Sequence, residues 1–336
     1  MIFNSILLTI FLTLLVIFQR KFLILVDNPL HQKHKKKDNK NIPLSGGLYL
    51  LISIIICDTY SVNSNSLFII ILLSFLILGI YSDTKINFSP KLRFLFQLIL
   101  ILIMIIFFDI EVNETGVFFL DIFIHNNFFN LVFTSFCIIV LLNGSNFCDG
   151  INCNIIGYYL IITLGIYFSD LIIPETYSLE KILLIFSIFY FFNLNNKCFL
   201  GDNGVYVLSI FMAVFVIQLI NMNIGISPLF ALNLLWYPAF ENLFTILRRV
   251  FKKQTIQDAD RHHLHTLIYE KLNKKYNTIY TNSLTGVLLN IYMLISLIFS
   301  IYYSGDTEKL MLIIIINIIF YLSVYRKLSA RKSLSR

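Results

Sequence analysis

Acidic, amide, basic and histidine side chains gather in five short polar segments of an otherwise apolar chain. In order, these segments are residues 27–47, 79–97, 143–152, 199–204 and 248–265. Carboxylates and Asn amides beside flexible glycines suit Mg²⁺, a hard cation that takes oxygen ligands and often shares them with substrate phosphates. Lys, Arg and His side chains at the same face suit phosphate oxygens. Together these residue types predict phosphoryl transfer, in which catalysis is mostly positioning and charge neutralisation.

The stretches between the polar segments are apolar enough to cross a membrane. Hydrophobic residues make up 57% of the 336 residues and charged residues only 13%, whereas soluble domains carry about 25% charged residues. A spanning helix needs about 20 mostly apolar residues, and backbone in lipid must satisfy its own hydrogen bonds. The sequence therefore predicts an all-α, polytopic transmembrane helical bundle of 10 or 11 helices, forming one domain over residues 1–336. The expected helices lie near residues 2–25, 46–60, 65–81, 91–108, 128–143, 155–173, 181–193, 204–222, 227–247, 284–303 and 309–325.

The distribution of charge predicts how the chain crosses the membrane. With eleven spans and the N-terminus outside, the inside segments hold 24 of the 26 Lys and Arg residues, and only Lys181 and Lys309 lie outside. This asymmetry follows the positive-inside rule for a plasma (inner) membrane protein. The C-terminus and all five polar segments are then cytoplasmic. Because a basic rim also suits anionic lipid headgroups, the net charge of +7 requires no nucleic-acid partner.

Each polar segment alone also fits an ordinary structural role. Asp149 and Asp202 lie in turn-like sequences, Asp83 is placed to end a helix, and the histidines at 262, 263 and 265 fit a polar loop or a transition-metal site. Their arrival on one face of the membrane favours a shared site instead. A site at the membrane surface implies that one substrate is a lipid phosphate and the other a soluble nucleotide.

The five ordered segments resemble the polyprenyl-phosphate N-acetylhexosamine-1-phosphate transferase family, or glycosyltransferase family 4, over residues 27–266. The family's first pattern, D-x-P-x-x-R-K-x-H followed by P and GG, is matched except that Gln32 replaces the Arg. The family's usual Asp-Asp pair is Ser82-Asp83 here, and Asn203 replaces the hydroxyl residue of F-[ML]-G-D-[ST]-G. In N-A-x-N-x-x-D-G-x-[DN]-G, Gly144 replaces the Ala and Cys153 the last Gly. The last pattern, D-R-x-H-L-H, is complete. The matching residues are Asp27, Pro29, Lys33, His34, Pro43, Gly46, Gly47, Asp83, Asn143, Asn146, Asp149, Gly150, Asn152, Phe199, Leu200, Gly201, Asp202, Gly204, Asp260, Arg261, His263, Leu264 and His265.

The resemblance implies a reaction and its substrates. Polyprenyl phosphate is a lipid of the bilayer, and undecaprenyl phosphate is the expected carrier. Its phosphate attacks the sugar-linked phosphate of a soluble UDP-HexNAc. UMP leaves, and polyprenyl-diphospho-HexNAc remains. This is the first membrane step of a cell-surface polysaccharide such as O-antigen or a cell-wall polymer. Mg²⁺ is the implied cofactor, with Mn²⁺ as the alternative, and a homodimer is compatible with the family.

The resemblance also implies roles for individual residues. Asp202 and Asn146 are expected to hold the metal, and Asp83, Asp149 and Asp202 form the catalytic set. Asp83 is expected to position or deprotonate the lipid phosphate. Since a phosphate monoester has a second pKa of about 6, it is already mostly a dianion at neutral pH, which favours positioning. Substrate contacts are expected from Lys33, Asn143, Asn152, Arg261, His263 and His265.

Two alternatives come from other classes of protein. A transporter or channel predicts acids or bases inside the spans, and the sequence offers none near the middle of an expected span. A non-catalytic membrane relative acting as an assembly partner is kept open by Ser82 and Asn203. Mg²⁺-dependent release of UMP would exclude both.

Overall fold

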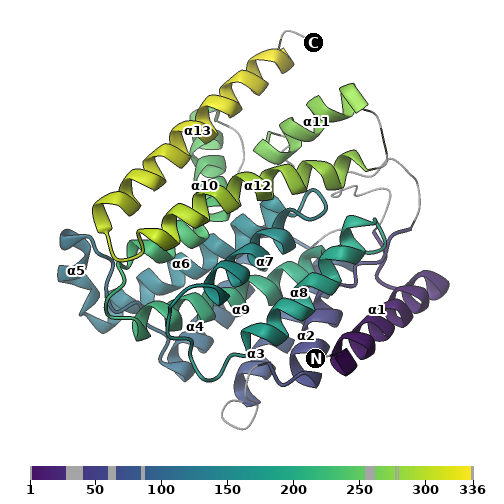
Figure 1. The fold of residues 1–336 in the computed structure, drawn as a ribbon, viewed down its shortest axis with the longest axis horizontal. Coiled ribbons are helices and arrows are strands. Elements are labelled where there is room, and N and C mark those ends of the chain that lie inside the picture. Colours follow the sequence, from purple (N-terminus) through teal and green to yellow (C-terminus); the bar gives the residue numbers. More distant parts are fainter. Residues whose placement is uncertain are drawn as a thin grey trace.

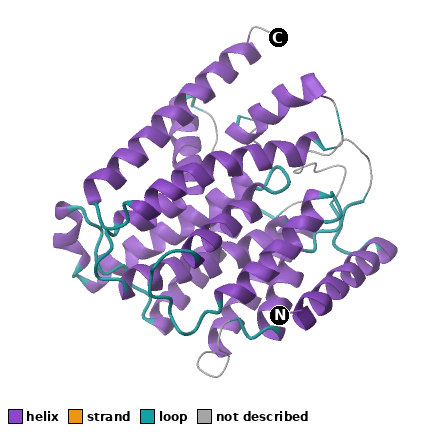
Figure 2. Cartoon of the chain, in the orientation of Figure 1, coloured by secondary structure: helices purple, strands orange, loops and turns teal. Residues whose placement is uncertain are grey.

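The protein is a bundle of α-helices. The computed structural model describes residues 2–27, 41–59, 66–84, 88–253, 262–276, 278 and 280–333. Within these ranges the chain forms thirteen helices and two isolated β-bridges but no strand (Figures 1 and 2). The helices are α1 (Ile2–Phe22), α2 (Gly46–Ile56), α3 (Ser66–Thr84), α4 (Pro90–Phe108), α5 (Phe118–Ile124), α6 (Asn127–Cys148), α7 (Asn154–Tyr167), α8 (Leu179–Leu194), α9 (Gly201–Met222), α10 (Leu229–Phe251), α11 (Leu264–Tyr276), α12 (Thr281–Tyr302) and α13 (Thr307–Ser333).

All eleven expected helices are present, and two short ones are additional. Helices α5 and α11 were not predicted, and they lie toward opposite ends of the bundle in Figure 1. Helix α5 has only 7 residues, and α11 carries many charges, so neither forms a charge-free apolar run. Several predicted boundaries are also wrong: for example, α7 ends at Tyr167 and α13 continues to Ser333. Helix α3 continues to Thr84 and α6 to Cys148, so residues expected in loops lie on the last turns of helices.

The helices have the length and hydropathy of a multi-pass membrane protein. Among the described residues, seven are long and apolar enough to cross a membrane: α1, α3, α4, α6, α9, α12 and α13. Helix α9 is the most enclosed of these, whereas α1, α4 and α13 expose most of their surface. Because apolar side chains face outward on the peripheral helices, lipid rather than water is their natural surrounding.

Helix α10 contains an internal proline, and a neighbouring helix supplies the hydrogen bond that this proline removes. Pro238 has no N–H, so it leaves the carbonyl of Leu234 without its helical donor. The hydroxyl of Tyr158 on α7 donates to that carbonyl at 2.6 Å. On the other side α6 approaches closely, since a Cβ on Gly144 would lie 1.9 Å from the Pro238 carbonyl oxygen. A Gly is therefore needed where the related family has Ala.

One acid lies inside a helix that the sequence predicts to span. Glu241, four residues beyond the middle of the expected span 227–247, is fully buried within α10. Its carboxylate is satisfied inside the protein: the imidazole of His263 lies beside one oxygen and the hydroxyl of Tyr321 donates to the other. A carboxylate engaged in this way gives no support to an ion path.

Candidate active site

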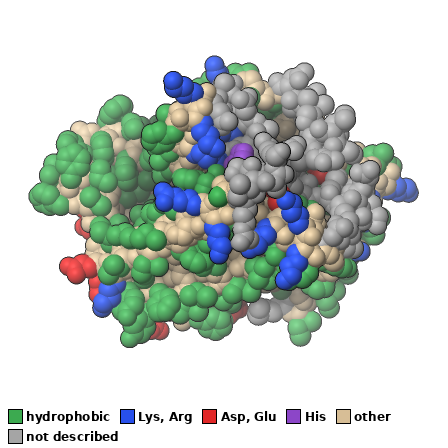
Figure 3. Space-filling view, turned by 90° about the horizontal axis from the view of Figure 1, so that it is seen from above, with side chains coloured by type: hydrophobic (Ala, Val, Ile, Leu, Met, Phe, Trp, Pro, Cys, Tyr) green, Lys and Arg blue, Asp and Glu red, His purple; other side chains and the backbone are tan. Residues whose placement is uncertain are grey.

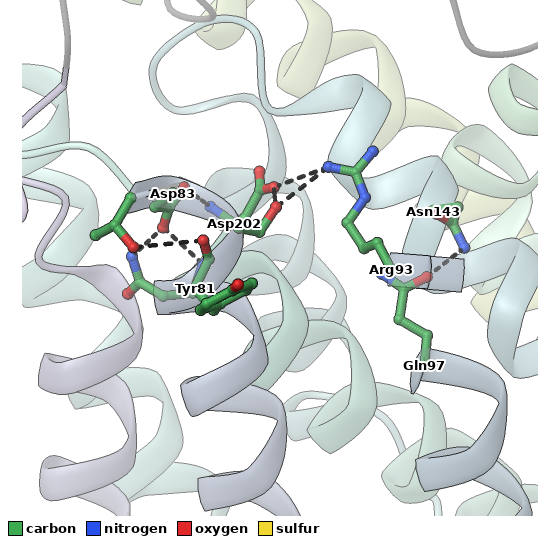
Figure 4. A network of polar contacts seen from close by, with 9 residues as sticks. Tyr81, Asp83, Arg93, Gln97, Asn143 and Asp202 are labelled. Carbon is green, nitrogen blue, oxygen red and sulfur yellow. Dashed lines mark hydrogen bonds and ion pairs between the residues drawn. The ribbon is translucent and has the colours of Figure 1, made fainter. Parts of the chain in front are cut away.

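The second and fourth polar segments meet where three helices begin or end. Ser82 and Asp83 lie on the last turn of α3, and Asp202 lies on the first turn of α9. Arg93 comes from the first turn of α4, which starts with a Ser89 side-chain cap followed by Pro90, a favourable pair at a helix N-terminus. We call the set Ser82, Asp83, Arg93, Asp202 and Asn203 the α9 N-terminal cluster (Figure 4).

Asp83 acts as a cap for α9 although it belongs to α3. Its Oδ1 accepts the backbone N–H of Asp202 at 2.9 Å, and its Oδ2 accepts the backbone N–H of Asn203 at 3.0 Å. The side-chain amide of Asn203 donates to the same Oδ2 at 2.6 Å. The first N–H groups of a helix have no partner within it, and the positive end of its dipole favours an anion. Asp83 therefore fixes the start of α9, and both of its oxygens are engaged.

Asp202 is held by a hydroxyl and a guanidinium. Ser82 Oγ donates to Asp202 Oδ2 at 2.6 Å, and Arg93 Nη1 approaches the same oxygen at 3.3 Å. Arg93 also donates to Ser82 Oγ at 3.2 Å. The serine that replaces the family's usual Asp thus contributes a donor to Asp202 rather than a second negative charge. The sequence assigned no role to Arg93, and its position just after Ser89-Pro90 was the only available signal.

Glycines allow α2 and α3 to reach the start of α9. A Cβ on Gly47 would lie 2.5 Å from the Asn203 carbonyl oxygen, and one on Gly79 would lie 2.3 Å from Asn203 Cα. The Gly47 N–H donates to Asn203 Oδ1 at 2.6 Å. A parallel bridge pairs Leu44 with Phe199. The end of the first polar segment is thereby joined to the second and the fourth.

The third segment is connected to this cluster through α4. One turn after Arg93, Gln97 Oε1 accepts the side-chain amide of Asn143 at 3.2 Å (Figure 4). Asn146 lies three residues further along α6, on the same face of the helix. Its side chain is half-buried and makes no hydrogen bond with the part of the chain that the structure describes. Among the predicted site residues described, Asn146 thus has an amide available to a ligand.

The third and fifth segments meet at the end of α6, in a set that we call the α6 C-terminal cluster: Phe147, Gly150, Glu241, His263 and His265. His263 stacks on Phe147 with 5.3 Å between ring centroids and on His265 with 5.6 Å. A Cβ on Gly150 would lie 2.5 Å from His265 Nε2, so the Gly leaves room for that imidazole. Asp149, the predicted catalytic acid of this segment, ends α6 beside the cluster and is buried.

Asn152 serves as an anchor in the structure. Its amide nitrogen donates to the Asn193 carbonyl at 2.8 Å and to Asn196 Oδ1 at 2.6 Å, while its backbone N–H donates to Asn282 Oδ1 at 2.8 Å. The side chain is nearly inaccessible. The next residue, Cys153, has a φ of +64°, a region that favours glycine. This explains why the related family has Gly at this place.

The predicted metal ligands are compatible with Mg²⁺ in type but form no preformed cage. Within the described residues no three His, Cys, Asp or Glu side chains gather as a metal site. Mg²⁺ commonly uses one or two protein carboxylates and takes the remaining ligands from water and substrate phosphates. The Asp202 carboxylate is suited to that role, although no hydrogen bond joins it to Asn146 in the described part of the chain. Lys33 and Arg261, two predicted substrate contacts, lie outside the described residues.

Basic side chains mark one face of the molecule, and an apolar cavity lies between its helices. Figure 3 shows Lys and Arg side chains around a histidine on one face. Deeper in the bundle, an apolar cavity of about 290 Å³ lies between α6, α9 and α10, with α5 at one end. Its lining includes Leu120, Phe133, Leu141, Ala213, Leu235 and Ala239. Because Ala239 and Leu141 are close in sequence to Pro238 and Gly144, the cavity approaches the α6–α10 contact.

The fold is that of a multi-pass membrane protein, and its polar clusters carry residue types suited to phosphorylated substrates. The model of a family described as glycosyl transferase family 4 matches residues 65–220, which contain the second, third and fourth polar segments. The chain is also similar to the probable undecaprenyl-phosphate N-acetylglucosaminyl 1-phosphate transferase of Bacillus subtilis (strain 168). The two are 26% identical over 255 residues, which cover 71% of this chain and 68% of the relative. With its five ordered motifs, the chain is similar to this family of polyprenyl-phosphate N-acetylhexosamine-1-phosphate transferases.

Proposed function

We propose that this protein transfers HexNAc-1-phosphate from a UDP-HexNAc to undecaprenyl phosphate. An oxygen of the lipid phosphate forms a bond to the sugar-linked phosphorus, the bond from that phosphorus to the UMP oxygen breaks, and UMP leaves with the electron pair. The observation that carries the proposal is the α9 N-terminal cluster. It combines a buried carboxylate, Asp202, with a partly exposed guanidinium, Arg93, at the junction of three motif segments.

The residues in and near this cluster have different proposed roles. Arg93 is placed to neutralise phosphate oxygens, because a guanidinium matches their geometry and stays charged. Asp83 positions α9 and hence Asp202; since both its oxygens accept hydrogen bonds from α9, we assign it no proton transfer. Asp202 and Asn146 would hold Mg²⁺, which supplies charge neutralisation at the diphosphate when bound. Asp149, His263 and His265 then face the sugar diphosphate or the nucleoside, and Lys33 and Arg261 add cations.

The lipid substrate is assigned to the apolar cavity. A polyprenyl tail is an extended chain of branched hydrocarbon units, and the cavity between α6, α9 and α10 offers an almost wholly apolar lining. Because the tail is already out of water in the bilayer, such a lining would hold it by close packing rather than by the hydrophobic effect. The cavity's approach to the α6–α10 contact would bring the phosphate end of such a lipid toward the polar clusters. We further propose that these clusters lie on the cytoplasmic face of the plasma membrane, with the N-terminus outside.

One experiment tests the reaction and the donor together. The purified protein in detergent is incubated with undecaprenyl phosphate, Mg²⁺ and each member of a panel of UDP-sugars, and release of UMP is followed with and without EDTA. Release with one UDP-HexNAc that EDTA abolishes would support the proposal and identify the sugar. Absence of release with every sugar, from protein that elutes as a single folded species, would contradict it and favour the non-catalytic relative.

A further inference from the structure

We propose that Glu241 is a positioning residue for the transfer reaction, which sets the orientation and tautomer of His263 from within α10. This inference rests on the proposed function. Glu241 and His263 both lie outside the region matched by the family model, residues 65–220, and the sequence gave no role to Glu241. The inference also draws α13, which follows the last motif, into the active site.

The geometry is that of a carboxylate shared between an imidazole and a phenol. Glu241 Oε1 lies 3.0 Å from His263 Nδ1, and the Tyr321 hydroxyl on α13 donates to Glu241 Oε2 at 2.7 Å. Glu241 is 0% exposed. Thr245, one helical turn further along α10, is a weaker neighbour of the same His263 nitrogen at 3.5 Å.

A buried acid at this place calls for a reason beyond packing. Removal of a carboxylate from water is costly unless it gains strong partners. A neutral glutamine or an apolar residue would fill the same space at lower cost. The carboxylate supplies something that those residues do not: a charged acceptor aimed at one nitrogen of an imidazole in the last motif.

The contact determines what the His263 ring can present to a substrate. With Nδ1 donating its hydrogen to a carboxylate, the ring is held in one tautomer. Stacking on Phe147 and His265 fixes the plane of the ring. In the part of the chain that the structure describes, Nε2 has no hydrogen-bond partner. Nε2 is therefore the atom that contacts a phosphate or sugar oxygen, and Glu241 holds it in place.

The position of Glu241 follows from the packing of α10. Glu241 lies one turn after Pro238, where Gly144 lets α6 approach the α10 backbone. Asn242, the next residue, donates its amide to the Val140 carbonyl of α6 at 2.9 Å. These contacts hold α10 against α6, which carries Phe147. Glu241 and Phe147 thus reach His263 from two helices that are fixed relative to each other.

The test compares Glu241→Gln with His263→Asn and with the double variant, using UMP release at saturating undecaprenyl phosphate. Glu241→Gln keeps the shape of the side chain and removes its charge. We expect kcat to fall about 10- to 100-fold, a range typical of partners that orient a functional histidine, with little change in KM for undecaprenyl phosphate. Because Glu241 acts through His263, the double variant should be no slower than His263→Asn alone.

Tyr292→Phe is the matched control, since it removes a tyrosine hydroxyl that donates to Asn317 Oδ1 on α13 and not to Glu241. We expect it to retain activity within about threefold, in line with the loss of one neutral donor. Wild-type kcat in Glu241→Gln, or losses that multiply in the double variant, would overturn the inference. If Glu241→Gln does not elute as a folded species, Glu241→Asp replaces it, with the same reduction expected because the shorter side chain cannot reach Nδ1. A wild-type protein that releases no UMP would overturn the proposed function, whereas an active Glu241→Gln in an active background overturns only this inference.

Discussion

The two polar clusters hold their functional groups in different ways. In the α9 N-terminal cluster, Asp83 is bound by backbone N–H groups of a helix end and Asp202 by direct contacts with Ser82 and Arg93. In the α6 C-terminal cluster, the imidazoles of His263 and His265 are held by stacked rings and by one buried acid. Backbone N–H donors at a helix end hold both oxygens of a carboxylate. Ring stacking fixes a plane but leaves freedom within it.

This difference suggests a division of labour. The rigid cluster suits the diphosphate, whose charge must be met at fixed positions for phosphoryl transfer. The stacked cluster suits recognition of a sugar or nucleoside, where small adjustments of a ring accommodate the ligand. Variants in the first cluster should therefore lower the rate constant kcat most, and variants in the second should affect kcat together with KM for the UDP-sugar.

The largest effect is expected from Asp202→Asn. It removes the buried charge that Ser82 and Arg93 surround, so we expect UMP release to fall about 1,000-fold or more with little change in thermal unfolding. Asp306→Asn is the control, because its carboxylate is bound to Lys309 at the other end of the bundle, and it should leave the rate unchanged. Turnover near the wild-type value in Asp202→Asn would remove this cluster from the chemistry.

Asp83→Asn should lower both activity and stability. The substitution leaves a weaker acceptor for the N–H groups at the start of α9, and loss of a helix cap costs about 1 kcal/mol. We expect UMP release to fall about 100-fold, because Asp202 moves with the helix end, and the unfolding temperature in detergent to fall as well. A loss of activity at unchanged unfolding temperature would show that Asp83 acts on substrate rather than on α9.

Gly150→Ala should act on the second cluster alone. The added Cβ would lie 2.5 Å from His265 Nε2, so the imidazole must shift, and we expect kcat/KM for the UDP-sugar to fall about tenfold, which corresponds to about 1.4 kcal/mol. Gly225→Ala is the control, since nothing lies within 4 Å of its added Cβ. Equal activity of the two variants would mean that the place of His265 does not matter for the donor.

Ser82→Ala should have the smallest effect. It removes one donor to Asp202 while Arg93 remains, and a hydrogen bond to a charged group contributes about 1.5–3 kcal/mol. Because substrate and water can replace part of this hydrogen-bond free energy, we expect UMP release to fall about fivefold at most. Ser74→Ala on the same helix is the control, since that hydroxyl bonds only to the Ile70 carbonyl of its own helix. A loss as large as that of Asp202→Asn would make the hydroxyl itself part of the reaction.

The sequence predicts the helices well because each one follows from the composition of its own stretch of chain. A charge-free apolar run of sufficient length must be helical in lipid, and this rule locates all eleven expected helices. It cannot find α5 or α11, which lack such runs. The structure also extends helices beyond the last apolar residue of a run, since Ser82 and Asn146 lie on helices although their side chains are polar.

The site was predictable as a set of motifs but not as a set of contacts. The motifs mark Asp83, Asp202 and His263, but no sequence spacing shows that Asp83 caps α9 or that Glu241 reaches His263. Those pairings depend on how distant helices cross. Single residues without a pattern, such as Arg93 and Glu241, leave no signal of their own. Asn152 shows the converse case, because the motif marks it for substrate contact and gives no sign that it also anchors α8 and α12.

The cap that Asp83 provides for α9 also has a consequence for biogenesis. The carboxylate and the N–H group of Asp202 are 119 residues apart in the chain, so α3 is synthesised and inserted well before α9 emerges from the ribosome. Until α9 docks between α2 and α3, the first turn of that helix lacks its acceptor and Asp202 lacks Ser82. The proposed catalytic centre is therefore a late product of membrane insertion, and a nascent chain that ends before residue 201 contains most of the motifs but no assembled site.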